Sequence, residues 1–220
     1  DGLVLCLDAA GTKSYPGSGT TWYDVSTNKK NATLTGTTFS SADGGSFYFD
    51  ESDAYASVPN FNVNSFTISS YVKLNKINDY QGIIGQASSI WSNLSFAFRF
   101  LNSNQLNISL SGSGTSSSNY KEVTAGTFFT SGQWYFVSCT FDAATDAVKL
   151  YSSGNEIGSN SCTFDLYPST SNIIIGGYAF GSGLSYLLNG NIAVIQLYDH
   201  ALSQDKIKQN FNATKGRFGL

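Results

Sequence analysis

The sequence predicts an all-β protein, a two-sheet antiparallel β-sandwich followed by one short C-terminal α-helix. Short apolar runs recur along the chain, and clusters of Gly, Ser, Asn and Asp separate them, as expected for strands joined by turns. No helical spacing stands between these runs, so the alternating strands and helices of a parallel sheet are not expected. Helical spacing appears only at the carboxyl end, where a capped helix closes the chain.

Strand-like segments fill the first half of the chain. We expect strands at Gly2–Leu7, Phe47–Asp50, Ala54–Val58, Ser65–Leu74, Ile83–Gly85, Leu94–Leu101 and Leu106–Leu110. The most regular of these, Ser65–Leu74, alternates apolar and polar residues and so places them on opposite faces of a strand. The acidic residues Glu51–Asp53, which lie between two of the strands, predict the turn of a hairpin.

The second half of the chain continues this pattern after a Ser- and Gly-rich loop at Gly112–Asn119. The segment Trp134–Phe141 is apolar on both faces, which is typical of a central strand covered on both sides. A second hairpin is expected from Val148–Tyr151 and Glu156–Ser159, which flank a short turn. The last strands are expected at Asn172–Gly176 and Ile192–Tyr198.

The terminal helix is predicted from its capping residues. Ser203 is a preferred N-cap residue, because its side-chain oxygen can accept a hydrogen bond from the first helical turn. Leu202 and Ile207 have the spacing of a hydrophobic staple, and Phe211 lies on the same face as Ile207. Gly216 is expected just after the last turn, where a left-handed backbone favours glycine.

The composition excludes two classes of partner. Charged residues make up only 12% of the 220 residues, and the formal net charge is −3. Nucleic-acid binding needs clustered Lys and Arg, which the chain lacks, and no apolar run is long enough for membrane insertion. We expect one domain over residues 1–220, because no linker divides the chain. The lack of methionine indicates a chain that begins inside a longer protein, or after processing or tag removal.

Few residues offer catalytic chemistry, so an enzyme is not expected. His200 is the only histidine, and no nucleophile lies beside it in the sequence, which favours a surface or corner position. The carboxylates within Asp50–Asp53 favour a solvated turn over a metal site, because turns prefer Asp. The three cysteines are odd in number, and a bond between Cys139 and Cys162 is left open.

Aromatic and amide side chains in loop-like settings are the candidates for ligand binding. An aromatic ring next to Asn or Asp can stack on a sugar ring while polar groups bind the sugar hydroxyls. The candidates are Trp22, Tyr80, Trp91, Asn93 and Tyr178. The alternative, that each ring folds inwards and anchors its loop, stays open because large exposed rings are uncommon.

Both ends of the chain carry a family resemblance. The opening GLVLCLDAAGTKSYPGSGTTWYDVSTNKKNATL and the ending GNIAVIQLYDHALSQDKIKQNFNATKGRF resemble concanavalin A-like, laminin G-like jelly-roll domains of tailed-bacteriophage virion proteins. The stretches GGSFYFDESDAYASVP, SFTISSYVKL and QWYFVSCTFDAATDAVKLYSSGNEIG resemble the same family. The resemblance implies a non-enzymatic, lectin-like virion module, assembled in the host cytoplasm and exposed on the particle exterior. Such a module would be a tail, fibre or head-appendage component that binds host-surface glycans.

The resemblance also implies partners and two alternative functions. Other virion proteins and host-surface glycans are the expected partners, and a homo-oligomer is left open. A purely structural decoration or cementing protein is the first alternative, and a glycoside hydrolase is the second. Hydrolases of this fold carry a Glu-x-Asp-x-x-Glu pattern on one strand, and none of the glutamates Glu51, Glu122 and Glu156 belongs to such a pattern.

The chain departs from the family at two positions near its end. Many members have an aspartate after the GxI of the last strand, where it helps to bind a structural calcium ion, whereas this chain has Ala193. No cofactor is therefore assigned, and a structural calcium is left open. Many members also have Asn-Arg-Ala-Leu-Ser at the strand–helix corner, so His200 replaces a basic corner residue and needs no special role.

Overall fold

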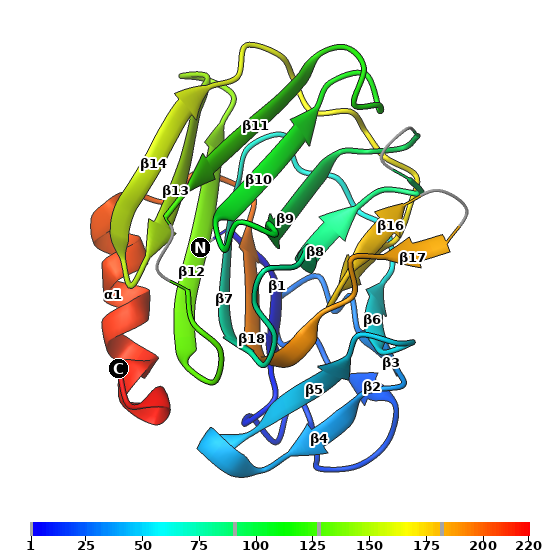
Figure 1. The fold of residues 1–220 in the computed structure, drawn as a ribbon, viewed down its shortest axis with the longest axis vertical. Coiled ribbons are helices and arrows are strands. Elements are labelled where there is room, and N and C mark those ends of the chain that lie inside the picture. Colours follow the sequence, from blue (N-terminus) through cyan, green and yellow to red (C-terminus); the bar gives the residue numbers. More distant parts are fainter. Residues whose placement is uncertain (1, 90–91, 127–128, 181–182) are drawn as a thin grey trace.

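The two large sheets of the protein pack face to face (Figure 1). The structure is a computed structural model, which describes residues 2–89, 92–126, 129–180 and 183–220. These residues form two eight-stranded antiparallel sheets, a two-stranded sheet and one α-helix, α1 (Gln204–Thr214). The predicted sandwich with a short C-terminal helix is thus confirmed. No helix within the described residues has the length and apolar character needed to cross a membrane.

Sheet A contains eight strands, among them the first and the last strand of the described chain. Its strands are β1 (Leu3–Asp8), β4 (Thr38–Ser40), β5 (Ser46–Asp50), β7 (Phe66–Leu74), β12 (Trp134–Asp142), β13 (Ala147–Ser152), β14 (Asn155–Ser161) and β18 (Asn189–Tyr198). Their order is β14-β13-β12-β7-β18-β5-β4, and β1 also pairs with β18. The register between β18 and β7 shifts between Ile192 and Val194. On its other edge, β18 pairs with β5 up to Ile192 and with β1 from Val194 onward, so Ala193 lies between the two partner strands.

Sheet B faces sheet A across the core. Its strands are β2 (Thr21–Trp22), β3 (Ala32–Thr35), β6 (Tyr55–Val58), β8 (Gln81–Gln86), β9 (Phe96–Phe100), β10 (Leu106–Ser111), β11 (Tyr120–Ala125) and β15 (Ile173–Ile175). Their order is β11-β10-β9-β8-β15-β6-β3-β2. A separate hairpin, β16 (Tyr178–Phe180) and β17 (Gly183–Ser185), lies on the side of the molecule away from α1 (Figure 1).

One predicted hairpin is wrong, because β5 belongs to sheet A and β6 to sheet B. The Asp50 carboxylate accepts hydrogen bonds from the backbone amides of residues 52–54, so the acidic segment forms the expected turn. That turn carries the chain from one sheet to the other. It does so because both flanking strands bury apolar residues in the shared core, Phe47 and Phe49 from one side and Val58 from the other.

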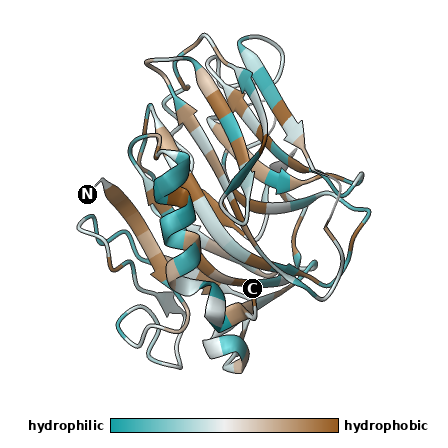
Figure 2. Cartoon of the chain, turned by 90° about the vertical axis from the view of Figure 1, so that its left-hand side faces the viewer, coloured by the Kyte–Doolittle hydropathy of each residue, from teal (hydrophilic) through white to brown (hydrophobic). Residues whose placement is uncertain are grey.

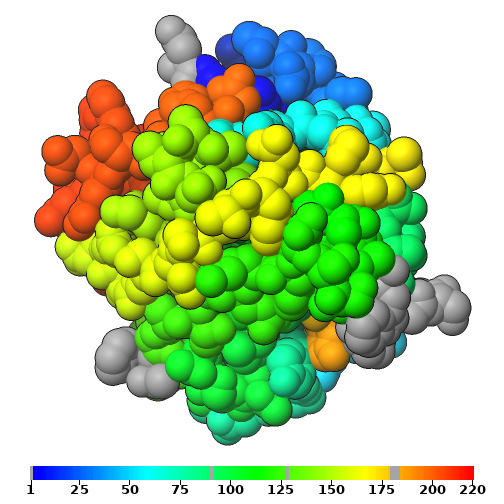
Figure 3. All heavy atoms as spheres, turned by 90° about the horizontal axis from the view of Figure 1, so that it is seen from above, coloured from blue at the N-terminus to red at the C-terminus, as the bar shows by residue number. Residues whose placement is uncertain are grey.

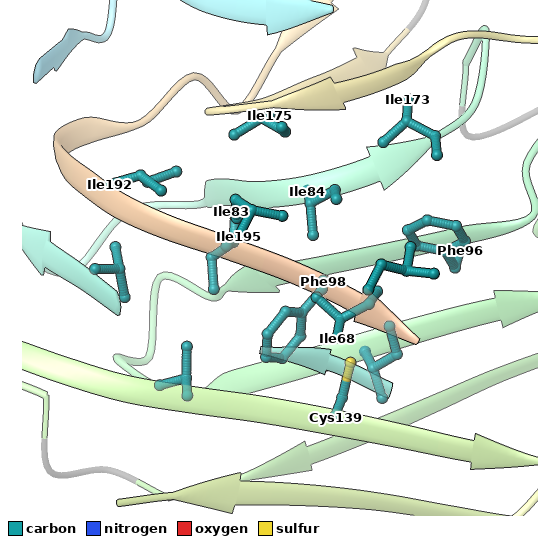
Figure 4. Packing of buried hydrophobic residues seen from close by; sticks show 14 of the residues in the cluster. Ile68, Ile83, Ile84, Phe96, Phe98, Cys139, Ile173, Ile175, Ile192 and Ile195 are labelled. Carbon is teal, nitrogen blue, oxygen red and sulfur yellow. The ribbon is translucent and has the colours of Figure 1, made fainter. Parts of the chain in front are cut away.

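The core between the sheets is built from apolar residues at alternate strand positions (Figure 4). Ile68 and Ile195 enter it from sheet A, and Phe98 enters it from sheet B. Cys139 lies fully buried among them and acts as a small apolar residue. All three cysteines lie in the described part of the chain and each has a free thiol, so Cys139 is not bonded to Cys162.

The helix α1 covers the outer face of sheet A and turns its polar residues to solvent (Figure 2). The Ser203 hydroxyl accepts a hydrogen bond from the Lys206 amide at 3.4 Å, which confirms the predicted N-cap. Ile207 and Phe211 are buried in one cluster with Tyr71 of β7. The central strands β7 and β12 are consequently buried on both faces, as the sequence of β12 predicted.

The α-helix ends at Thr214 with Lys215 as its C-cap, so Gly216 follows it as predicted, but Gly216 lacks the expected left-handed backbone. A 3₁₀ turn, η2 (Lys215–Phe218), continues the helical path, and the left-handed residue is Gly219 with φ of 70°. The Phe218 ring stacks on Tyr71 with the ring centroids 4.0 Å apart. Packing of this ring therefore carries the chain past Gly216, although glycine is a good terminator by itself.

One end of the sandwich is covered by the segment that joins β14 to β15. Figure 3 looks down on this end, where the yellow residues 162–172 lie beside the green loop 112–119. The Tyr167 amide donates a hydrogen bond to the Ser111 carbonyl at 2.8 Å, and the Gly112 amide bonds to the Asn119 carbonyl at the same distance. The Ser- and Gly-rich loop predicted from the sequence is thus anchored at its base.

Candidate functional site

Small residues line the centre of the outer face of sheet B. The strand register places the small residues Gly85, Ala97 and Ser109 side by side on β8, β9 and β10, and Glu122 on β11 ends the row. Their neighbours along each strand point into the core instead, as the buried Phe96, Ile108 and Val123 show. A row of this kind leaves space above the sheet that side chains from the surrounding loops can border.

The β16–β17 hairpin lies over β8 and borders this row on one side. A Cβ atom at Gly85 would lie 2.9 Å from the Cβ atom of Tyr178, so the close approach of the hairpin requires glycine. The Tyr178 ring stacks on Tyr186 with centroids 5.0 Å apart, and Tyr80 packs on Tyr186 at the same distance. Three tyrosines therefore form one continuous aromatic group.

Arg99 on β9 is a charged residue in a buried strand. Its side chain is only 8% exposed, and its two terminal nitrogens donate to the Tyr178 hydroxyl at 2.7 Å and to Glu122 Oε1 at 2.6 Å. The guanidinium also lies 5.2 Å from the Tyr178 ring centroid, in the geometry of a cation–π contact. Arg99 therefore joins the hairpin to the sheet, and a buried charge is tolerated because it is paired.

Three polar side chains of the site form hydrogen bonds with Glu122 on β11. Besides Arg99, the Tyr120 hydroxyl donates to Oε1 at 2.6 Å and the Ser109 hydroxyl donates at 3.0 Å. The Glu122 side chain is nevertheless 42% exposed, so its carboxylate also faces solvent. Burial, and then the neighbouring Glu122, raise the pKa of Tyr120, so this hydroxyl stays protonated and can donate hydrogen bonds at neutral pH.

These side chains border a hollow of about 370 Å³. Its lining residues are Tyr80, Arg99, Ser116, Tyr120, Glu122, Tyr178 and Tyr186. Aromatic rings and fixed hydrogen-bonding groups converge there, which is the usual make-up of a small-molecule site. Flat rings can pack on the C–H face of a sugar, and the carboxylate, hydroxyl and guanidinium groups can bind its hydroxyls.

Tyr186 sits at the centre of the aromatic group in a strained backbone conformation. Its φ of 51° lies in the left-handed region, where a bulky residue is a genuine outlier. The Gly82 amide donates to the Tyr186 carbonyl at 2.7 Å and helps to hold this conformation. Strain of this kind persists where surrounding contacts fix it, and it is concentrated at functional sites.

The structure brings together two of the five residues predicted to bind a ligand. Tyr80 is half-buried at the border of the hollow. Tyr178 lies in its wall but is only 2% exposed, so it supports Tyr186 and Arg99 instead of offering a free face. Asn93 is tied elsewhere, because its carbonyl and side chain accept hydrogen bonds from Ser169 and Thr170.

The prediction for Trp22 is wrong, and Trp91 lies outside the described residues. Trp22 is completely buried, and its ring packs edge-on against Phe47 at 4.8 Å. The polar residues around it in the sequence indicated an open loop. Instead, Trp22 belongs to the short strand β2, whose pairing with β3 turns the ring into the core.

Sequence reasoning missed Arg99, Tyr120, Glu122 and Tyr186. Arg99 carried a usable signal, because an arginine inside the apolar run FAFRF is a charge that must find a partner. Tyr120 and Glu122 share one face of β11 through simple alternation. Tyr186 carried no such signal in the sequence, since its place beside Tyr80 depends on how the hairpin crosses β8.

Three other features discussed from the sequence lie outside the hollow. His200 is exposed at the strand–helix corner, where its ring nitrogen contacts Asp199 at 3.0 Å. Glu51 pairs with Lys76 at 2.5 Å, and no group of three or more His, Cys, Asp or Glu residues in the described ranges is arranged to hold a metal ion. Ala193 is fully buried beneath the helix.

Comparison with known proteins identifies the family. The model of the concanavalin A-like lectin/glucanases superfamily named Laminin_G_3 matches residues 49–208. No curated protein sequence matches the chain significantly. The binding domain of Paraclostridial Mosquitocidal Protein 1 superposes with a TM-score of 0.75 at 16% identity, over 97% of this chain and 52% of that one. This chain therefore spans about half the length of that structure.

Two further structures share the fold at similar identity. The receptor-binding domain of botulinum neurotoxin C/D mosaic serotype gives a TM-score of 0.74 at 16% identity, over 97% of this chain and 51% of that one. Domain 4 of AbnA, an extracellular arabinanase from Geobacillus stearothermophilus solved in complex with arabinotriose, gives 0.69 at 16% identity, over 94% and 97%. The family match covers more than half of the sequence, so the chain belongs to the Laminin_G_3 family of the concanavalin A-like lectin/glucanases superfamily.

Proposed function

We propose that the protein is a non-enzymatic, lectin-like module that binds glycans in the hollow on the outer face of sheet B. The observation that carries the proposal is the meeting of the Tyr80–Tyr186 pair with Arg99, Tyr120 and Glu122 around one hollow. Structural neighbours support a binding role, since two are toxin binding domains and a third was solved with a trisaccharide.

The chemistry of the hollow matches a sugar better than an apolar ligand. The half-buried rings of Tyr80 and Tyr186 can pack on the C–H groups of a pyranose or furanose ring. The exposed part of Glu122 can accept hydrogen bonds from sugar hydroxyls, while Ser116 can donate and accept. Arg99 and Ser109 hold Glu122 in place, so the ligand meets a pre-organised acceptor.

Binding without hydrolysis is favoured by the number of carboxylates. Glycoside hydrolysis uses two carboxyl groups on either side of the scissile bond. Among the described residues that line this hollow, Glu122 is the only carboxylate.

We further propose that this module acts on a tailed-bacteriophage particle, as a tail, fibre or head-appendage component facing the host surface. The resemblance of both ends of the chain to virion proteins supports this setting. Other virion proteins would then be its partners. Imaging of assembled particles tests the setting: solvent-facing hollows are expected, whereas hollows buried against other subunits would favour a cementing role.

The binding proposal is tested with a glycan array of bacterial surface oligosaccharides. The wild-type chain is expected to bind, and Tyr186→Ala and Glu122→Gln are each expected to lower affinity about tenfold or more. Tyr23→Ala is a matched control, because Tyr23 is an exposed tyrosine on a loop outside the hollow. Circular dichroism checks that each variant is folded. Absence of binding by the wild type, or equal losses in Tyr23→Ala, would contradict the proposal.

A further inference from the structure

A second hollow lies against the same pair of tyrosines. Its volume is about 360 Å³, close to that of the first hollow, and Tyr80 and Tyr186 line both. The other residues around it include Glu51, Ser52 and Asp79, which come from two different loops. The Tyr80–Tyr186 pair is therefore a wall that both hollows share. We call this pair the ridge, and the two hollows with the ridge the double hollow.

The ridge is rigid enough to act as a fixed support. Tyr186 is held from below by the stacked, buried ring of Tyr178, whose hydroxyl is fixed by Arg99. Tyr80 and Tyr186 meet at 5.0 Å with their planes tilted by 58°. Two tilted rings present faces in different directions, so sugar units on the two sides of the ridge can each find an aromatic surface.

The charges around the double hollow disfavour an anionic ligand. Arg99 is the only cation among its described lining residues, and Glu122 already neutralises it at 2.6 Å. In the second hollow, Glu51 and Asp79 both pair with Lys76, at 2.5 and 2.7 Å. Three carboxylates and no unpaired cation thus border the space, which suits the hydroxyls of a neutral sugar and repels carboxylates or sulfates.

We infer that the double hollow binds a neutral oligosaccharide that crosses the Tyr80–Tyr186 ridge and places sugar units in both hollows. The inference rests on the proposed glycan-binding function and specifies its ligand. A single sugar can occupy one hollow only, so a chain long enough to cross the ridge gains contacts that a monosaccharide lacks. Affinity should therefore rise steeply with chain length and then level off.

The test is calorimetric titration with size-graded probes. The probes are neutral gluco- and arabino-oligosaccharides of one to six residues, and oligogalacturonides of the same lengths as anionic counterparts. We expect the affinity of a neutral series to rise about tenfold or more between one and four residues. At equal length, the oligogalacturonide should bind about tenfold more weakly, and added salt should reduce that difference.

Ser52→Trp tests the second hollow separately. Ser52 is exposed in a turn beside this hollow, so a bulky side chain can fill the space without disturbing the core. The variant should lose the gain from longer chains and keep monosaccharide affinity. Ser185→Trp, from the hairpin side, provides an independent variant with the same expectation, and Tyr23→Trp is the exposed control.

The outcomes separate the two proposals. If neither these probes nor the glycan array shows binding, glycan binding itself is wrong and the inference falls with it. If the array shows binding but none of these probes binds, only the inference is overturned. If probes bind but affinity is the same for one and six residues, only the inference is overturned. The same holds if oligogalacturonides bind more tightly than neutral chains, or if both tryptophan variants retain the full gain from chain length.

Discussion

The two outer faces of the sandwich differ in how they are covered. On sheet A, large residues such as Tyr71 and Phe136 stand out from the strands, and α1 covers them with Ile207 and Phe211. On sheet B, the central row is small, and the β16–β17 hairpin covers only one side of it. One face is therefore sealed by apolar packing, while the other keeps a polar hollow open to solvent.

This difference shows how one architecture separates stability from recognition. The sealed face contributes apolar burial, which is the main favourable term in folding. The open face contains features that cost stability, namely the paired but buried Arg99 and the left-handed backbone at Tyr186. Substitutions on the sealed face should therefore change stability without changing binding, whereas substitutions on the open face should change binding.

The largest effect on stability is expected for Phe211→Ala on the sealed face. Phe211 is only 9% exposed and packs on Phe136 with ring centroids 5.5 Å apart. Removal of this ring should lower the free energy of unfolding by about 3 kcal/mol, measured by urea denaturation. Gln209→Ala, at an exposed position on the same helix, is the control and should change it by less than about 0.5 kcal/mol. Glycan binding should stay at the wild-type level in both variants.

Gly85→Ala should disturb the open face. The new Cβ would lie 2.9 Å from Tyr178, so the hairpin must move away from β8. We expect a loss of about 2 kcal/mol in the free energy of unfolding, together with weaker binding, because overpacking shifts the aromatic group. Gly216→Ala is the matched control, since nothing lies within 4 Å of a Cβ there. Equal stability of the two variants would show that the hairpin does not rest on β8.

Tyr186→Gly should separate the effect on stability from the effect on glycan binding most clearly. Loss of the half-buried ring costs packing, but glycine relieves a left-handed conformation worth roughly 1 to 2 kcal/mol. The free energy of unfolding should therefore change by less than about 1 kcal/mol, while affinity for glycans falls about tenfold or more. Tyr186→Ala, which keeps the strain, should be less stable than Tyr186→Gly. The reverse order would show that the backbone at this position is not strained.

The smallest effect is a pH dependence that both faces share. Burial raises the pKa of Tyr71 under the helix and of Tyr178 in the hollow above their ordinary value of 10.0. The unfolded chain releases these protons near pH 10 while the folded chain keeps them. Stability should therefore be constant at lower pH and fall as the pH rises above about 10.

Urea denaturation between pH 8 and 11 measures this slope. Burial, and then Asp8 and Asp24, raise the pKa of Cys6 from 9.0 to about 11, so this thiol adds a decline that begins near pH 9. Cys6→Ala removes the contribution of the thiol. In that background, Tyr178→Phe and Tyr71→Phe should each make the decline shallower. A stability that stays flat up to pH 11 would contradict the burial of these hydroxyls.

Much of the fold could be predicted, because its signals are local. The strand β7 was predicted from alternation, β12 from a run that is apolar on both faces, and the N-cap of α1 from its capping residue. The strands β2, β4, β16 and β17 were not predicted, because two or three residues are too few to show a period. The longer strands β3 and β11 were also missed, although both alternate buried with more exposed residues. The hairpin across residues 51–53 failed for a different reason, since a turn sequence does not state whether the next strand joins the same sheet.

The candidate site was predicted only in part, because its members meet through long-range pairing. Tyr80 and Tyr178 were chosen as loop aromatics and do border the hollow. Arg99 and Tyr178 are 79 residues apart in the sequence, and no local pattern links them. Trp22 failed because a polar sequence neighbourhood describes the residues beside a ring and not the space into which the ring points.

The sequence by itself determined the class of the molecule, a β-sandwich closed by a capped helix, together with the absence of the charge needed for nucleic-acid binding. Periodicity and capping act between near neighbours, so they can be recognised in a single chain. The tertiary structure decided which outer face is sealed and which stays open. That choice depends on strand register, which sets small residues in one row, and on the place where a distant hairpin crosses it.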